Sequence, residues 1–212
     1  MAKNKIILVE GPTDYFFVKA IFDSSIIKKK IDLKHCKGYP NLMSHELRTQ
    51  YKVDEIEIIA IIVDADADFN QRWTDIKQHF LSLEPSITLP TDIDKNGLIH
   101  FENDITFGIW IMPNNKSEGM LENFMENLVP KEDQLFIKVK STITEIEAQQ
   151  LNRYKPIHKS KATMRTWLAL QNPPNGKIEL LIEDNLLTTN NETCNTFVAW
   201  LNKLFNPIIT TT

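Results

Sequence analysis

Cysteine is scarce in this chain, whose 212 residues include two, Cys36 and Cys194. The two lie far apart and form neither a Cys-x-x-Cys pair nor a Cys/His zinc pattern, so the sequence offers no disulfide framework. Both are expected to be buried free thiols in a reducing compartment. No apolar run approaches the roughly 20 residues that a membrane-spanning helix needs. We therefore expect a cytoplasmic protein that does not engage a membrane.

The chain also lacks an excess of positive charge, because its formal net charge is -4. The field of the whole molecule does not attract polyanions, so a nucleic acid would have to be bound by a local basic patch. Part of the negative balance comes from candidate metal ligands, whose charge a bound Mg²⁺ would offset.

Apolar runs typical of buried strands alternate with segments of helical spacing, and the length suits one sizeable domain. This alternation predicts an α/β fold with a central, mostly parallel sheet flanked by helices. Strands are expected over residues 5–9, 31–36, 56–63 and 106–112, and helices after Thr13 or Asp14 and over 40–51, 71–83, 120–128, 132–151, 161–170 and 191–205. We expect residues 1–128 to form an α/β core and residues 129–212 a helical extension packed on it.

Candidate metal-binding carboxylates occur in three separate segments of the sequence. Glu10 follows the first expected strand, Asp64, Asp66 and Asp68 follow the strand over 56–63, and Glu122 lies in the expected helix over 120–128. The carboxyl ends of parallel strands meet at one edge of a sheet, where clustered negative charges are costly unless a divalent cation neutralises them. The pattern predicts a Mg²⁺ or Mn²⁺ site, with Asp68 as an outer contact. The alternatives are helix capping near Glu10 and a solvated acidic loop after the strand.

In order and spacing these residues resemble the Toprim domain. This is the metal-binding α/β module of type IA and type II topoisomerases, bacterial primases and nucleases related to the overcoming-lysogenization-defect family. Its Glu-Gly after the first strand and Asp-x-Asp after the third are matched by Glu10-Gly11 and Asp64-Ala65-Asp66. The likeness covers about residues 3–128 and is greatest to small standalone Toprim proteins. It implies a Rossmann-like sheet.

The resemblance also implies Mg²⁺-dependent phosphodiester chemistry on nucleic acid, most simply that of a nuclease. Glu10 would act as general acid or base or as a metal ligand, while Asp64 and Asp66 would hold Mg²⁺. Glu122, preceded by Gly119, looks like the later glycine-and-acid station of the nuclease branch and could complete a second metal position. The chain shows no Walker A loop, topoisomerase tyrosine domain or primase zinc module, so strand passage and primer synthesis are not expected of this polypeptide alone.

Basic residues gather around the start of the expected helix over 161–170. They are Lys155, His158, Lys159, Lys161 and Arg165. Cations and the first amides of a helix can hold phosphate together, although a solvated helix start is the alternative. Because the related nucleases are expected to carry a lysine near the metals, we take Lys161 as the catalytic cation and the other four as phosphate or nucleic-acid contacts.

A second basic run, Lys28–Lys30 with Lys34 and Lys37, is interpreted as a solubilising surface. Trp110, Trp167 and Trp200 fall in apolar periodic segments and are assigned to the core.

Two other functions remain open. A haloacid-dehalogenase-like phosphatase also carries Asp-x-Asp after a strand, with Asp64 as nucleophile and Asp66 as acid. Against it, Asp68 stands where a small hydroxyl residue usually follows, and Glu10 is left without a role. The other candidate is a non-catalytic subunit that binds metal or nucleic acid within a partner complex, for which an ATPase is one candidate partner.

Overall fold

The computed structural model describes residues 4–24, 31–174 and 177–206, and its centre is one five-stranded sheet in the order β2-β1-β3-β5-β4. The strands are β1 (Asn4–Val9), β2 (Asp32–His35), β3 (Ile56–Asp64), β4 (Leu98–Glu102) and β5 (Ile105–Met112). Four strands run parallel, while β4 pairs antiparallel with β5 at one edge. The predicted α/β class and mostly parallel sheet are confirmed.

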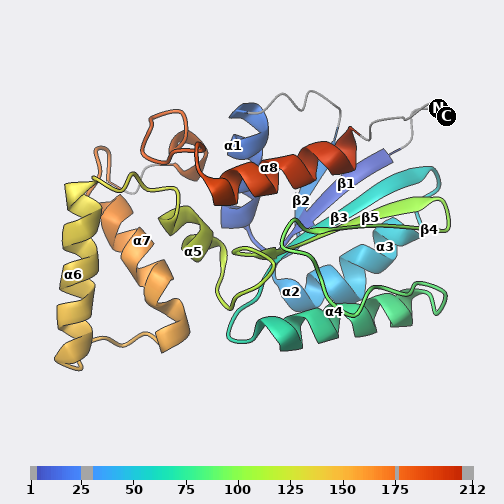
Figure 1. Cartoon of the computed structure of the whole chain (residues 1–212), viewed down its shortest axis with the longest axis horizontal. Helices are drawn as coiled ribbons and strands as arrows, with labels where there is room; N and C mark the ends of the chain where they lie inside the picture. Colours follow the sequence, from blue (N-terminus) through green and yellow to red (C-terminus); the bar gives the residue numbers. More distant parts are fainter. Residues whose placement is uncertain (1–3, 25–30, 175–176, 207–212) are drawn as a thin grey trace.

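Helices cover both faces of the sheet (Figure 1). One face carries α1 (Pro12–Ser24), α5 (Leu121–Glu126) and α8 (Glu192–Phe205). The other carries α2 (Tyr39–Asn41), a π-helical turn (Leu42–Glu46), α3 (Leu47–Tyr51) and α4 (Phe69–Leu83). The segment expected as one helix over 40–51 is therefore helical throughout, with a wider turn in its middle.

The central strand β3 explains why the sheet needs two covering layers. Its residues Ile58 to Val63 are all buried, and successive side chains point to opposite faces. Ile58, Ala60 and Ile62 join the core under α1, α5 and α8, whereas Ile59, Ile61 and Val63 join the core under α4. A continuous apolar run is what a strand buried on both faces requires.

The C-terminal part is helical, as predicted, and shares a core with the sheet. It contains α6 (Gln134–Ala148), the 3₁₀ turn η2 (Pro156–His158), α7 (Lys159–Ala169) and the 3₁₀ turn η3 (Ile178–Leu180) before α8. Figure 1 shows α6 and α7 at one end of the molecule, beyond α5. Phe136 of α6 and Trp167 of α7 nevertheless belong to the same apolar cluster as Ile7 of β1.

The core assignments made from the sequence are confirmed. Trp110, Trp167 and Trp200 are buried, and Cys36 and Cys194 are buried free thiols. Within the described chain, no helix combines the length and apolarity needed to cross a bilayer. The predicted basic positions 28–30 lie outside the described residues.

Helix α8 packs closely on β5 because the strand has a glycine beneath it. A Cβ added to Gly108 would lie 2.4 Å from Cδ2 of Leu204 and 3.1 Å from the Trp200 ring. Trp200 also donates a hydrogen bond from Nε1 to the Leu98 carbonyl oxygen at 3.1 Å, which ties α8 to β4. The missing side chain at Gly108 therefore sets how near the helix can approach the sheet.

We expect Gly108→Ala to lower the free energy of unfolding by about 1 to 3 kcal/mol, because the added methyl forces the α8 side chains away from the strand. Urea denaturation measures this change. The double variant Gly108→Ala/Leu204→Ala should lose less stability than the sum of the two single variants, since truncating Leu204 makes room for the methyl. Full tolerance of Gly108→Ala would contradict the packing described.

Candidate active site

The strands β1 and β3 place a crevice at their carboxyl ends. The chain leaves β1 for α1 on one face and leaves β3 for α4 on the opposite face, so the two connections diverge. In open α/β sheets, ligands bind where neighbouring strands send their connections to opposite sides. Glu10 directly follows β1 at this point, and Asp64 is the last residue of β3.

A cavity of about 410 Å³ lies at this point and contains both acidic and basic side chains. Its carboxylates are Glu10, Asp14, Asp64 and Glu122, and its cations are Lys37, Lys161 and Arg165. They come from the ends of β1 and β3 and from α1, α5, α7 and the loop after β2. The structure thus brings together Glu10, Asp64, Glu122, Lys161 and Arg165 of the residues predicted for the site.

Backbone amides hold three of these carboxylates in place. The Asp64 amide donates to Oε1 of Glu10 at 2.9 Å, and the Leu121 amide at the start of α5 donates to Oδ1 of Asp64 at 2.8 Å. The Gly11 amide donates to Oδ2 of Asp14 at 3.1 Å. Each bond fixes one oxygen of a carboxylate, so its second oxygen is oriented by the same contact.

Glu122 is held in a different way, by a cation. Its Oε1 lies 3.4 Å from Nζ of Lys161, and its side chain is 8% exposed. Glu122 stands in the first turn of α5, where the helix N-terminus also favours a negative charge. The ion pair joins α5 to α7 across the wall of the cavity.

The carboxylates are electrostatically strained as a group. Burial raises the pKa of the Glu10 carboxyl to about 7, and repulsion by Asp14 and Asp66 adds to the effect. Burial likewise raises the pKa of Asp14 to about 6, with further repulsion from Glu122. For Asp64 burial is again the largest cause, followed by the charges of Asp14, Glu10 and Glu122, and its pKa lies well above its ordinary value. Removing water and crowding like charges both disfavour the ionised forms.

The donor set fits a hard divalent cation. Carboxylate oxygens are the ligands that Mg²⁺ prefers, and a cation would offset the repulsion that raises these pKa values. In the described part of the chain, no three His, Cys, Asp or Glu side chains are arranged to chelate an ion as they stand. Backbone amides and Lys161 hold the carboxylates instead. The residues that would hold a metal here are Glu10 and Asp64, with Asp14 and Glu122 beside them.

The second and third aspartates of the predicted metal segment lie outside the residues that line the cavity. Asp66 has a φ of 54°, exchanges two backbone hydrogen bonds of 2.8 Å with Gly119, and forms an ion pair with Arg72. The Asp66 side chain is half exposed, and its negative charge contributes to the raised pKa of Glu10. Asp68 caps α4 by accepting a hydrogen bond from the Gln71 amide at 3.0 Å. The left-handed residue at Asp66 turns the chain away before Asp68.

The predicted basic cluster divides between two places. Lys161 and Arg165, one turn apart on α7, line the carboxylate cavity. Lys159 forms an ion pair with Glu147 and lines a neighbouring pocket of about 430 Å³. His158 is the residue before α7, and Lys155 precedes the 3₁₀ turn η2.

Two of the charged residues that line the cavity, Asp14 and Lys37, were not predicted from the sequence as site residues. Asp14 stands in the first turn of α1, where an acid is explained equally well by helix capping. Lys37, taken as part of a solubilising run, reaches the cavity because β2 pairs with β1 and brings its following loop beside Glu10, where the Gly38 amide donates to the Glu10 carbonyl oxygen at 2.8 Å. The Lys34 of the same run forms an ion pair with Glu46.

Residues 4–206 match the family model described as protein of unknown function (DUF3226). The chain belongs to the DUF3226 family. No curated protein and no solved structure matches it significantly. The DUF3226 match runs from β1 through α8, so the sheet, the cavity and the helices α6 and α7 fall within one family unit.

The free energy of unfolding of the metal-free protein should fall as the pH rises. A carboxyl whose pKa is higher in the folded state holds its proton there after the unfolded chain has lost it, which opposes folding. For Glu10 this window runs from its ordinary pKa of 4.5 to about 7, and the loss is on the order of 1 to 3 kcal/mol. Urea denaturation in EDTA across this range measures it.

Glu10→Gln keeps the acceptor for the Asp64 amide but removes the charge, so its stability should vary less with pH over this window. If the free energy of unfolding of wild type and of Glu10→Gln depends equally on pH, the Glu10 carboxyl does not have a raised pKa in the folded state.

Proposed function

We propose that this protein is a Mg²⁺-dependent, Toprim-type nuclease that hydrolyses phosphodiesters of nucleic acid in the carboxylate cavity. The observation that carries this proposal is the meeting of four acidic and three basic side chains in one cavity at the carboxyl ends of β1 and β3. A site for a neutral or cationic small molecule would not need the cations, and a simple anion site would not need the carboxylates. A metal and a phosphate bound together need both.

The metal would be held by Glu10 and Asp64, with Asp14 and Glu122 completing the donor set. When bound, Mg²⁺ would supply positive charge that polarises a phosphoryl oxygen, which favours attack of water on the phosphorus and departure of the leaving oxygen. Manganese satisfies the same oxygen ligands.

The cations of α7 have a complementary role. Lys161 and Arg165 face the same cavity from one helix and bind the anionic phosphate oxygens, where charge grows during the reaction. Lys161 now pairs with Glu122, and a phosphate is a competing partner for its ammonium group. Glu10 stands at the turn between β1 and α1, where a carboxylate can accept a proton from the attacking water.

The resemblance to Toprim domains supports the same assignment. Glu10-Gly11 follows β1 and Asp64 ends β3, which are the positions of the Glu-Gly and of the first aspartate in that pattern. The position of Asp66 departs from the simplest form of the pattern, because its carboxylate pairs with Arg72. We propose that Asp66 acts on the site through its charge near Glu10 and through Arg72. The same ion pair weighs against a dehalogenase-like role for Asp66 as the proton donor.

Glu10→Gln and Asp64→Asn should each lower hydrolysis by about 100-fold or more, because each removes charge that holds the metal. The assay is cleavage of labelled single-stranded DNA, duplex DNA and RNA with Mg²⁺ or Mn²⁺. Asp68→Asn is the matched control: it makes the same chemical change outside the cavity and keeps a good helix cap, so its activity should stay close to wild type.

Three outcomes of this assay contradict the nuclease proposal. Full activity in Glu10→Gln or Asp64→Asn defeats the residue assignment. Metal binding without turnover on any of the nucleic acids favours a non-catalytic binding subunit. Trapping of a phosphoaspartate at Asp64 during phosphomonoester hydrolysis favours the dehalogenase-like chemistry.

Mg²⁺ should stabilise the wild-type protein against thermal unfolding, since it binds the folded state alone. At a free concentration one hundred times its dissociation constant the gain is about 2.7 kcal/mol. Asp64→Asn should lose this gain, whereas Asp68→Asn should keep it. Differential scanning calorimetry with Mg²⁺ and with EDTA measures both, and equal stabilisation of Asp64→Asn and wild type would remove Asp64 from the metal site.

A further inference from the structure

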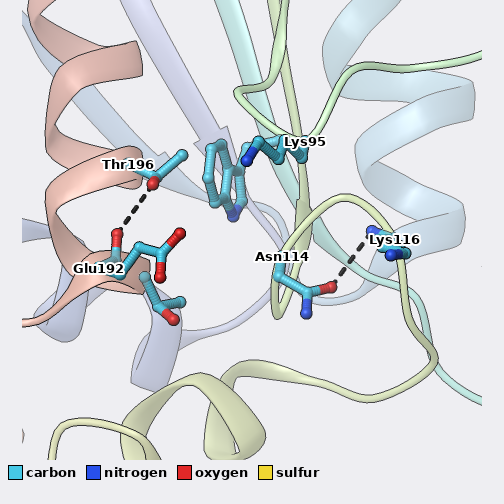
Figure 2. A pocket seen from close by; sticks show the side chains of 7 residues that line it. Lys95, Asn114, Lys116, Glu192 and Thr196 are labelled. Atoms are coloured by element: carbon cyan, nitrogen blue, oxygen red, sulfur yellow. Dashed lines mark hydrogen bonds between the residues drawn. The ribbon is translucent and has the colours of Figure 1, made fainter.

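A second pocket, of about 260 Å³, lies between the start of α8 and the loop after β5. It is lined by Lys95, Trp110, Asn114, Lys116, Glu192, Thr193 and Thr196, none of which lines the carboxylate cavity. Figure 2 shows Glu192 and Thr196 on the helix at one side, Asn114 and Lys116 on the loop at the other, and Lys95 above them. Nothing in the proposed nuclease chemistry uses this pocket.

Buried hydrogen bonds fix the loops that form the pocket. Asn115 is 2% exposed, accepts a hydrogen bond from the Ile111 amide at 2.6 Å, and donates one to the Lys95 carbonyl oxygen at 3.3 Å. It thereby joins the loop after β5 to the turn before β4. At the pocket edge, Oδ1 of Asn114 accepts a hydrogen bond from the Lys116 amide at 3.2 Å. The two lysines are thus attached to backbone that the fold holds in place.

The charges of this pocket favour an anion. Lys95 and Lys116 are exposed and form no ion pair within the described chain. The first amides of α8, at Glu192 and Thr193, have no intrahelical acceptor because they lie in the first turn of the helix. The capping side chain of Asn191 accepts from the Cys194 amide and not from these two. The N-terminus of a 14-residue helix therefore adds partial positive charge to that of the two lysines.

A buried donor without an acceptor is the second, independent feature. Trp110 is 1% exposed, and its Nε1 has no hydrogen-bond partner in the described chain. Leaving such a group unpaired costs about 1 to 3 kcal/mol. The Phe197 and Trp200 rings pack against its indole at centroid distances of 5.0 and 5.5 Å. Trp110 is one of the residues that line the pocket, and these rings hold its indole in place.

We propose that this pocket binds a phosphate group. The oxyanion takes hydrogen bonds from the Trp110 N–H, from the first amides of α8 and from the ammonium groups of Lys95 and Lys116, whose long side chains rotate to admit it. Glu192, exposed at the rim, accepts a hydrogen bond from a hydroxyl of the same ligand. A free nucleotide and the backbone of a nucleic acid both supply this combination.

The test is a titration followed by ¹H–¹⁵N NMR, with the indole N–H signals as local reporters. Inorganic phosphate, a nucleoside monophosphate and a 5′-phosphorylated single-stranded oligonucleotide are added in EDTA. Trp110→Phe keeps the ring but removes the donor, so it assigns the Trp110 signal. We expect this signal and the Thr193 amide to shift saturably, while the indole signal of Trp167, which is also buried and unpaired but outside the pocket, stays constant.

The double variant Lys95→Gln/Lys116→Gln should weaken phosphate binding, measured on the Trp110 signal, by about tenfold or more. Lys131→Gln/Lys138→Gln removes the same charge from exposed positions outside the pocket and should leave the affinity unchanged. Thermal unfolding of both variants checks that the fold is intact.

The oligonucleotide and the nucleoside monophosphate distinguish the two sources of phosphate. Tighter binding of the monophosphate identifies a nucleotide pocket, and tighter binding of the oligonucleotide identifies a backbone contact. An unshifted Trp110 signal at millimolar concentrations of all three ligands overturns the proposal, as does equal affinity of the two double variants. Neither result depends on whether the carboxylate cavity cleaves anything.

Discussion

Burying several carboxylates at the junction of β1 and β3 is the constraint on which this structure depends. Each buried charge loses hydration, and each repels its neighbours, so the raised pKa values of Glu10, Asp14 and Asp64 have a common origin. The fold partly offsets this cost with backbone amides, which come from β3 for Glu10 and from α5 for Asp64. The backbone geometry at the strand ends therefore determines how far the electrostatic cost of the cavity is offset.

The same constraint explains why the C-terminal helices are joined to the sheet. The carboxylates come from the ends of β1 and β3 and from α1 and α5, but the cavity cations Lys161 and Arg165 come from α7. Their helix is anchored by Trp167, which packs on Phe136 of α6 at a centroid distance of 5.7 Å. A truncated protein ending near residue 128 would keep the acidic side chains and lose two of the cations that balance them. The helical extension is thus part of the site.

How far the sequence predicts this arrangement depends on how local each feature is. Glu10 and Asp64 stand directly after apolar runs in the sequence, so their meeting at one edge of the sheet can be predicted from the order of the elements alone. The positions of Asp66 and Lys37 depend on partners distant in sequence. Asp66 is turned aside by its backbone pairing with Gly119 and its carboxylate pairs with Arg72, whereas Lys37 reaches the cavity only because β2 pairs with β1. The pocket beside Trp110 is assembled from three separate segments, which no local pattern indicates.

The distribution of charge bears on the proposal that this acidic molecule binds a polyanion. Four carboxylates are concentrated inside one cavity, where a bound metal would neutralise them locally, and their field beyond the cavity would then be weak. Lysines and arginine stand at the cavity and at the pocket beside α8, both near the carboxyl ends of the parallel strands. Net charge then says little about the ligand, because contacts with phosphate are governed by charges within about one Debye length, roughly 10 Å at 0.1 M salt. A bound metal would thereby convert an acidic edge of the sheet into one that accepts phosphate.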